Sequence, residues 1–503
     1  MTNPILTLSQ ALSRALSAYK AGKLVEAERI CQQIIIAKHD LFDAHHLLSV
    51  VQSCLGKKDL ALANFDRALA LRPDSAEALS NRGATLKELK RFDEALASFA
   101  RALQVRPDYA EALYNRGTTR NELKQFDEAL ASFDRALSTQ PGFAEALSNR
   151  GITLHELKRF EEALASFNRA LEVRPDYVEA LSNRGNTLED LKRFEEALAS
   201  FDRALEVRPD YAKALYNRGN TLQELKRFDE ALVSYDRAIK AQPGFAEALY
   251  NEGTCRLLIG DFGSGWEKNE WRWDTEQFSG NRRNFAQPLW GGSNEIVGKS
   301  ILLHAEQGFG DTIQFCRYVP LVAERGARVI LEVQRPLREL MNTLAGAALV
   351  VSRGDLLPDF DTHCPLLRLP LAFGTRLETI PSTTPYLRAS PQALMDWDAR
   401  LGGTKRHPRI GLAWSGNPKN AYDRDRSMRL GYLLPLLAID ATFVSLQYDV
   451  PRKDIEMLRD RSELLHFGDA LKGFSEPAAL ISNLDLVITV DTSAPVRWES
   501  PLG

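Results

Sequence analysis

Hydrophobic and polar positions in the first half of the chain repeat every 34 residues. Within one period, residues 78–89 predict a first helix and residues 92–105 a second, joined by the short charged turn Lys90-Arg91. A helix pair of this kind can bury its apolar face only against its neighbours. The pattern therefore predicts an α-solenoid of stacked helix pairs.

Two further markers keep the same period and set the limits of the repeats. Prolines that open short turns stand at Pro73, Pro107, Pro141, Pro175, Pro209 and Pro243, and Asn-Arg-Gly triplets begin at Asn81, Asn115, Asn149, Asn183 and Asn217. Because such turns mark helix boundaries, we expect six full repeats over residues 42–245. A degenerate repeat or cap is expected before them at 1–41, and a degenerate capping repeat after them at 246–279.

Small and aromatic residues explain how the two helices of a pair pack. Gly83 suits a close helix crossing, Ala95 and Ala102 are small, and Phe99 fills the space between neighbouring pairs. This combination, closed by the proline, resembles the tetratricopeptide repeat. The departure is an arginine before each glycine, where that family often has an apolar residue, and its simplest interpretation is that it points outward: Arg82, Arg116, Arg150, Arg184 and Arg218.

The resemblance implies that proteins or peptides bind on the concave surface, which is lined largely by the first helix of each pair. The candidate contacts are the repeated asparagines Asn81, Asn115, Asn149, Asn183 and Asn217. An amide ladder can hydrogen-bond the backbone of an extended peptide without reading its side chains, and the repeat part of O-linked N-acetylglucosamine transferases is similar in this respect. In the alternative, these amides satisfy neighbouring helix backbones, or the near-identity of the repeats reflects recent duplication.

The last repeat loses the consensus and gains Trp266, Trp271 and Trp273. A solenoid end must cover its exposed apolar face, so these residues predict a cap or a surface that docks the next domain. A tryptophan ligand cage is the alternative. The polar segment 280–299, which lacks a clear helix or strand period, is expected to be a connector.

From Ser300 onward, short apolar runs alternate with helices, which is typical of a parallel α/β sheet. Strands are expected at residues 301–304, 327–333, 349–352, 409–414, 443–447 and 486–490. A segment rich in Pro and Thr, residues 380–386, divides this region into two Rossmann-like halves, 300–385 and 386–503. Two such halves make a cleft with ligands at the carboxyl ends of the strands.

The first half opens with a strand, the loop Glu306-Gln307-Gly308-Phe309-Gly310-Asp311 and a helix. Gly308 and Gly310 let the backbone approach a ligand, and the helix start offers N–H groups to an anion. The loop is similar to the Gly-x-Gly-Asp loop of bacterial glycosyltransferases of the lipopolysaccharide heptosyltransferase type, which have the GT-B fold. The chain also resembles bacterial proteins that fuse tetratricopeptide repeats to such a domain. The resemblance implies sugar transfer from a nucleotide-diphosphate donor with Asp311 as general base; a plain helix cap is the alternative.

The second half carries the candidate donor-binding residues. Asn417 lies in a Gly-Asn-Pro turn, and Arg424 and Arg426 follow it closely. Guanidinium groups match phosphate oxygens and neutralise a leaving group's charge, although an exposed salt-bridged loop would explain the same residues. The resemblance implies further donor contacts at Gln447, Asp491, Thr492 and Ser493.

The family has a histidine and a helix soon after its Asp-Thr-Ser turn, whereas residues 494–500 contain no histidine and the sequence stops at Gly503. The second half is therefore expected to be incomplete, and we hypothesise a truncated or frameshifted descendant of a glycosyltransferase. Two classes of function remain open. One is a peptide-binding glycosyltransferase, and the other is a non-catalytic protein-interaction scaffold with a relic glycosyltransferase domain.

Composition argues against several classes of binding site. The net charge of -3 argues against a strongly basic nucleic-acid surface. Five cysteines without C-x-x-C spacing suggest neither a zinc site nor a disulfide framework. We expect no metal and no cofactor beyond the nucleotide-sugar donor. Without a signal peptide or a long apolar run, the sequence predicts a cytoplasmic protein that does not span a membrane.

Overall fold

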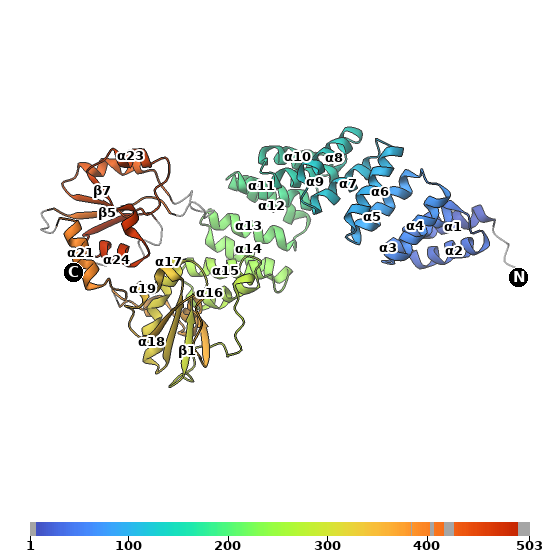
Figure 1. Ribbon diagram of the computed structural model, residues 1–503. Helices are drawn as coiled ribbons and strands as arrows, with labels where there is room; N and C mark the ends of the chain where they lie inside the picture. Colours follow the sequence, from blue (N-terminus) through green and yellow to red (C-terminus); the bar gives the residue numbers. More distant parts are fainter. Residues whose placement is uncertain (1–6, 384, 403–406, 417–426, 491–503) are drawn as a thin grey trace. The chain divides into compact units, whose positions relative to one another are not determined.

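The computed structural model describes residues 7–383, 385–402, 407–416 and 427–490. The chain forms two compact units, Met1–Pro243 and Gly244–Gly503, which are considered separately below. Figure 1 traces their helices and strands along the sequence.

The first unit consists of helix pairs in one register. Its helices are α1 (Leu8–Lys20), α2 (Leu24–Ala37), α3 (Phe42–Cys54), α4 (Lys58–Leu71), α5 (Ala76–Glu88), α6 (Phe92–Val105), α7 (Ala110–Glu122), α8 (Phe126–Thr139), α9 (Ala144–Glu156), α10 (Phe160–Val173), α11 (Val178–Asp190), α12 (Phe194–Val207), α13 (Ala212–Glu224) and α14 (Phe228–Ala241). The first helices of successive pairs begin 34 residues apart, from Leu8 to Ala212. The two helices predicted at 78–89 and 92–105 are confirmed as α5 and α6.

The turn inside each pair passes through one residue in the left-handed conformation. Lysine takes this position five times, with φ between 58° and 60°, at Lys90, Lys124, Lys158, Lys192 and Lys226. In the two pairs before them the position belongs to Gly22 and Gly56, with φ of 73° and 75°. Such a residue lets the chain bond back to the helix end, as Lys90 N does to Lys87 O at 2.8 Å.

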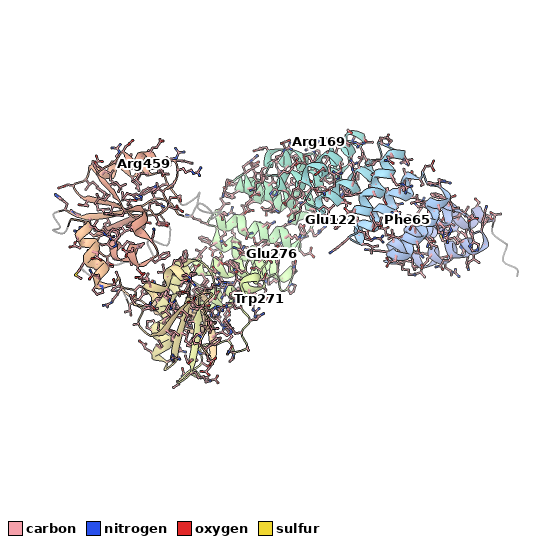
Figure 2. The ribbon with its side chains drawn as sticks, in the orientation of Figure 1. Phe65, Glu122, Arg169, Trp271, Glu276 and Arg459 are labelled. Atoms are coloured by element: carbon pink, nitrogen blue, oxygen red, sulfur yellow. The ribbon has the colours of Figure 1, made fainter. Side chains whose placement is uncertain are left out.

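The two helices of a pair meet where a glycine faces an aromatic ring. A Cβ atom added at Gly83 would lie 2.6 Å from Cε1 of Phe99, and one added at Gly151 would lie 2.7 Å from Cε1 of Phe167. Gly117, Gly185 and Gly219 face Phe133, Phe201 and Tyr235 in the same way. We call this the glycine–aromatic contact. In the α3–α4 pair the equivalent ring is Phe65, which is buried on α4 and labelled in Figure 2, but the position of the glycine belongs to Ser49.

The second unit begins with one more helix pair in the same register, α15 (Ala246–Leu258) and α16 (Phe262–Asn269), followed by the 3₁₀ turn η1 (Glu270–Asp274). Trp266 packs against the core of the first sheet and meets Phe315 edge to face, with ring centroids 5.8 Å apart. Trp271, labelled in Figure 2, is 37% exposed. Trp266 therefore docks this helix pair onto the α/β region.

The first sheet is parallel, with the strand order β3-β2-β1-β4. Its strands are β1 (Ser300–His304), β2 (Arg328–Val333), β3 (Ala347–Ser352) and β4 (Thr362–Pro365), and short helices follow at α17 (Phe309–Phe315), α18 (Val319–Glu324), α19 (Arg338–Met341) and α20 (Leu369–Ala372). From β1, the strands β2 and β3 follow on one side of the sheet and β4 lies on the other side. The carboxyl ends of β1 and β4 therefore lie at a topological switch point, where open α/β sheets bind ligands.

Residues 280–299, predicted to be a connector, pack into this half. Trp290 is 3% exposed and belongs to the core of the first sheet. Its backbone N–H donates to His363 O at 2.8 Å, and His363 N donates to Pro288 O at 3.1 Å. The segment thereby covers the outer edge of β4.

The second sheet repeats the order of the first as β7-β6-β5-β8, again parallel. Its strands are β5 (Arg409–Ala413), β6 (Thr442–Ser445), β7 (Leu464–His466) and β8 (Leu486–Thr489), and the helices are α21 (Pro391–Arg400), α23 (Ile455–Arg459) and α24 (Ser475–Ile481). One core cluster contains Trp414 and Phe443, and another contains Trp397 and Val444. The two halves touch at Phe309 and Phe474, whose ring centroids are 5.0 Å apart.

All six predicted strands are present, with ends within two residues of the prediction. The sequence did not reveal β4 and β7, which are four and three residues long. The predicted Rossmann-like halves correspond to two four-stranded parallel sheets. That these sheets form a GT-B domain stays a prediction.

Candidate functional site

The five repeated asparagines lie half-buried on the first helices α5, α7, α9, α11 and α13. Successive first helices contact one another along the first unit, which places them on the inner side of its curve. Three of the asparagines bond to the preceding pair. Asn81 Nδ2 lies 3.2 Å from His46 Nε2, Asn149 Nδ2 donates to Tyr114 Oη at 3.0 Å, and Asn217 Nδ2 donates to Asn186 Oδ1 at 2.7 Å. We call these the paired asparagines.

Asn115 and Asn183 differ from these three. Their backbone carbonyls accept hydrogen bonds from Thr119 and Thr187, at 2.7 and 2.9 Å, as the carbonyls of the other three do from the equivalent threonines, so the difference lies in the side-chain amides. Their side-chain amides make no hydrogen bond to any part of the chain that the structure describes, and neither amide is sealed from solvent. We call them the open asparagines. The three paired asparagines thus bond to side chains of the preceding repeat rather than to the neighbouring helix backbone, which was the alternative to peptide binding.

The arginine before each glycine does not point outward. Arg82 Nη1 donates to Ser98 Oγ at 2.8 Å on the second helix of its own pair. Its Nε donates to Asp66 Oδ1 at 2.8 Å on the second helix of the preceding pair. We call this arrangement the arginine clasp, because it joins two successive pairs.

The arginine clasp recurs with small changes. Arg150 uses Asp134 and Ser166, Arg184 uses Asn168 and Ser200, and Arg218 uses Asp202 and Ser234. In the α15–α16 pair, Glu252 stands where the arginine would be and Lys268 where the serine would be, with 2.6 Å between Lys268 Nζ and Glu252 Oε2. The two positions have changed together and kept their contact.

One inner carboxyl has an unusual environment. Glu189, in the last turn of α11, accepts a hydrogen bond from Thr221 Oγ1 at 3.2 Å. Burial raises the pKa of Glu189 to about 7, with the nearby carboxylates of Asp190 and Glu224 acting in the same direction. Gln223 holds the equivalent position one period later.

In the α/β region, Asp311 lies in the first turn of α17, close to the carboxyl end of β1. Its Oδ2 accepts a hydrogen bond from Gly308 N at 3.0 Å, so the carboxylate caps the helix. Burial raises its pKa, and the backbone N–H groups of Gly308 and Asp311 oppose that shift. Gly310 has open space beside its Cα. The structure thus places Gly308, Gly310 and Asp311 together, and the role of Asp311 as a base stays a prediction.

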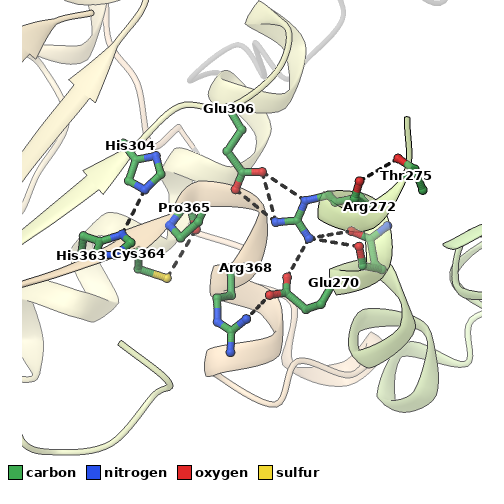
Figure 3. Close-up of polar contacts among 10 residues, drawn as sticks. Glu270, Arg272, Thr275, His304, Glu306, His363, Cys364, Pro365 and Arg368 are labelled. Carbon is green, nitrogen blue, oxygen red and sulfur yellow. Dashed lines mark hydrogen bonds and ion pairs between the residues drawn. The ribbon is translucent and has the colours of Figure 1, made fainter. Parts of the chain in front are cut away.

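The sequence did not reveal a buried chain of charges beside this loop (Figure 3). Arg272 in η1 is fully buried and donates to Glu306, with 3.1 Å between Nη2 and Oε2. Its Nη1 also donates to Glu270 Oε1 at 2.7 Å, and Glu270 Oε2 pairs with Arg368. Burial raises the pKa of Glu306 to about 7, and Arg272 opposes the shift. This chain fastens the end of the last helix pair to the loop that carries Asp311.

Two histidines lie on the other side of the β1 end. His304 Nε2 and His363 Nδ1 are 3.3 Å apart, and Phe285 packs against both rings. His304 Nδ1 is buried and makes no hydrogen bond to any described residue. Burial lowers the pKa of His304 to about 3, with His363 and nearby arginines adding to the shift. His304 is therefore neutral at ordinary pH.

At the second sheet, Gln447 was predicted to contact a nucleotide. Its Oε1 accepts from Trp414 N at 3.2 Å and from Ser415 N at 3.1 Å. Its Nε2 donates to Ser415 O at 2.8 Å and to Asp449 O at 2.9 Å. These bonds use the full capacity of the amide, so Gln447 joins the ends of β5 and β6. The predicted donor residues Asn417, Arg424, Arg426, Asp491, Thr492 and Ser493 lie outside the described residues.

The described residues lack two features that would indicate a particular class of site. They contain no group of three His, Cys, Asp or Glu side chains arranged to hold a metal ion. None of their helices combines the length and the apolar character that a membrane span requires.

Comparison with known proteins identifies the repeats. Residues 74–142 and 176–244 match one family model of the tetratricopeptide repeat, and residues 144–177 match another. The helix pairs over these residues are tetratricopeptide repeats. Protein FlbA of Caulobacter vibrioides is 26% identical over 265 residues, which is 47% of this chain and 43% of FlbA. The chain therefore spans less than half the length of that relative.

Solved structures resemble parts of the chain. YrrB, described as a tetratricopeptide repeat protein with an unusual peptide-binding site, is 28% identical, with a TM-score of 0.33 over 37% of this chain and 97% of YrrB. A tetratricopeptide repeat protein from Parabacteroides merdae is 20% identical, with a TM-score of 0.39 over 50% of this chain and 97% of that protein. PilF of Pseudomonas aeruginosa is 18% identical, with a TM-score of 0.39 over 44% of this chain and 96% of PilF.

The raised pKa of Glu189 predicts a specific dependence of stability on pH. Folded Glu189 keeps a proton that the unfolded chain releases between its ordinary value of 4.5 and about 7. The unfolding free energy should therefore fall as pH rises through this window, by about 3 kcal/mol. Glu189→Gln, which copies Gln223, should remove that part of the slope. Urea unfolding of both chains at several pH values measures it, and a stability difference that does not change with pH would contradict the assignment.

Proposed function

We propose that the tetratricopeptide solenoid binds an extended peptide or an unfolded segment of a protein along its first helices. The observation that carries the proposal is the pair of open asparagines. Asn115 and Asn183 occupy the same position on α7 and α11, two periods apart, and their amides are half-buried, accessible and unbonded within the described chain. A side-chain amide can donate to and accept from a peptide backbone at once.

The threonines one helical turn after the asparagines are not available to a ligand. Thr119, Thr153 and Thr187 are fully buried and donate to backbone carbonyls of their own helices. Amides that contact only the backbone give affinity without strict sequence selection. The paired asparagines fix the spacing of neighbouring repeats, and the open ones remain for the ligand.

The open and paired asparagines should respond differently to alanine. Replacing Asn115 and Asn183 together should weaken peptide binding about tenfold, because each lost hydrogen bond costs about 0.5–1.5 kcal/mol. It should leave thermal stability nearly unchanged. Replacing Asn81 and Asn149 together is the matched control and should lower stability, because His46 and Tyr114 lose their partners.

Fluorescence anisotropy with labelled peptides selected on the unmodified chain measures the first effect, and calorimetric unfolding measures the second. Equal loss of binding in both double variants would show that the open asparagines have no special role.

We further propose that the α/β region binds a nucleotide-diphosphate sugar and transfers the sugar, as a GT-B glycosyltransferase does. The supporting observation is that both parallel sheets have the same strand order, each with a switch point beside its first strand. Gly308, Gly310 and Asp311 lie next to that point in the first sheet. In the proposed reaction Asp311 accepts the proton of the acceptor hydroxyl, the oxygen bonds to the sugar carbon, and the nucleotide diphosphate leaves with the bonding electrons.

Calorimetric titration with UDP, ADP and GDP and their sugar conjugates tests this second proposal. Binding of one of them should weaken at least tenfold in Arg426→Ala, since a lost charge-assisted contact to phosphate costs about 1.5–3 kcal/mol. Asp311→Asn should leave donor binding intact and abolish transfer, because the amide still caps α17 but cannot take a proton. The absence of binding by any nucleotide to a chain with folded repeats would favour the alternative, a non-catalytic scaffold.

A further inference from the structure

The arginine clasp is incomplete at one position. In the other clasps the arginine reaches an acceptor on the preceding pair: Asp66 for Arg82, Asp134 for Arg150, Asn168 for Arg184 and Asp202 for Arg218. The residue at that position before Arg116 is Ala100, which has no acceptor. Among the described residues, Arg116 keeps only the side-chain contact to its own pair, with 3.1 Å from its Nε to Ser132 Oγ.

A second arginine stands one helical turn away. Arg120 occupies the position that belongs to leucine in the neighbouring repeats: Leu86, Leu154, Leu188 and Leu222, all of them fully buried. Leu86 packs with Leu62, Ala95 and Phe99, between the second helices of two successive pairs. The 34-residue period therefore directs Arg120 toward the corresponding groove between α6 and α8. Its Nε is buried without a hydrogen bond to any described residue.

These two cations are not neutralised by the described chain. Neither Arg116 nor Arg120 forms an ion pair with any carboxylate in it, including Glu128 at the start of α8. Burial lowers the pKa of Arg116, and the charges of Arg120 and Arg135 lower it further. A half-buried cation without a partner is destabilising. The other clasps contain an acceptor on the preceding pair, and the clasp of Arg116 does not.

The position of the missing acceptor is exposed to solvent. Ala100 is exposed on α6, and in the preceding pair the equivalent Asp66 side chain is 59% exposed while bonded to Arg82. A group from outside the chain can therefore reach the place that an aspartate would occupy. Ser132 would not donate to it, because its hydroxyl donates to Glu128 O at 2.9 Å.

We propose that Arg116 and Arg120 form a binding site for an oxyanion, a carboxylate or a phosphate group, between α6 and α8. The ligand's oxygens take the place of the missing aspartate on Arg116. The planar guanidinium matches both kinds of group. Ala100 takes the place of an internal acceptor, and Arg120 adds a second cation where the neighbouring repeats have leucine. Both departures therefore make the space between α6 and α8 more positively charged. The site lies among the second helices and is independent of the open asparagines.

Hydrogen exchange of the full chain tests this site. Exchange in α6, α7 and α8 should be slower in sodium phosphate, sodium succinate or both than in sodium chloride of equal ionic strength. At an anion concentration of about ten times Kd the slowing should approach tenfold. Helices α10, α11 and α12 serve as the internal control for general effects of salt on stability.

Ala100→Asp is the decisive variant, because it supplies the carboxylate that other repeats contain at this position. It should slow exchange in chloride and abolish the additional response to oxyanions. Arg120→Leu, which restores the leucine of the neighbouring repeats, should also lose the response. Slowing by phosphate alone or by succinate alone would assign the natural ligand to that class of oxyanion. No oxyanion-specific slowing in the unmodified chain, or a response that survives in Ala100→Asp, would overturn the proposal.

Discussion

The contact between a glycine on the first helix and a buried aromatic ring on the second sets the geometry of the solenoid. No side chain fits between Gly151 and Phe167, since an added Cβ would lie 2.7 Å from the ring. The two helix axes therefore approach closely, and the ring completes the interior of the pair. Because the same contact returns every 34 residues in the five pairs from α5 to α14, these pairs have the same shape and stack on one another in the same way.

Against such a regular background, single departures are the candidate sites. Three asparagines bond to the preceding repeat, whereas Asn115 and Asn183 make no such bond within the described residues, and these two are the proposed peptide contacts. Four arginines reach an acceptor on the preceding repeat, whereas Arg116 faces Ala100. Glu252 and Lys268 reverse the polarity of the same position in the pair that docks on the α/β region.

Periodicity in the sequence predicted the helix pairs, the close helix crossing at Gly83, and six of the strands, because each leaves a regular or continuous signal. The short strands β4 and β7 leave too little signal. The sequence alone predicts that the clasp arginines point outward, which is wrong, because their partners stand 16 residues away in either direction. Arg272 and Glu306 are 34 residues apart, and only the docking of η1 against β1 brings them together. Polar contacts between distant elements depend on how those elements pack together, and a single sequence does not show that packing.

The most direct test of the central claim compares two glycine-to-alanine variants in the same repeat region. Gly151→Ala places a methyl group against Phe167, whereas Gly142→Ala places one in open space. Chemical unfolding of the full chain should show that Gly151→Ala lowers the unfolding free energy by about 1–3 kcal/mol. Gly142→Ala should change it by less than about 0.5 kcal/mol, and Phe167→Leu should recover part of the loss when combined with Gly151→Ala. Equal stability of the two single variants would contradict the claim that the glycine–aromatic contact sets the helix spacing.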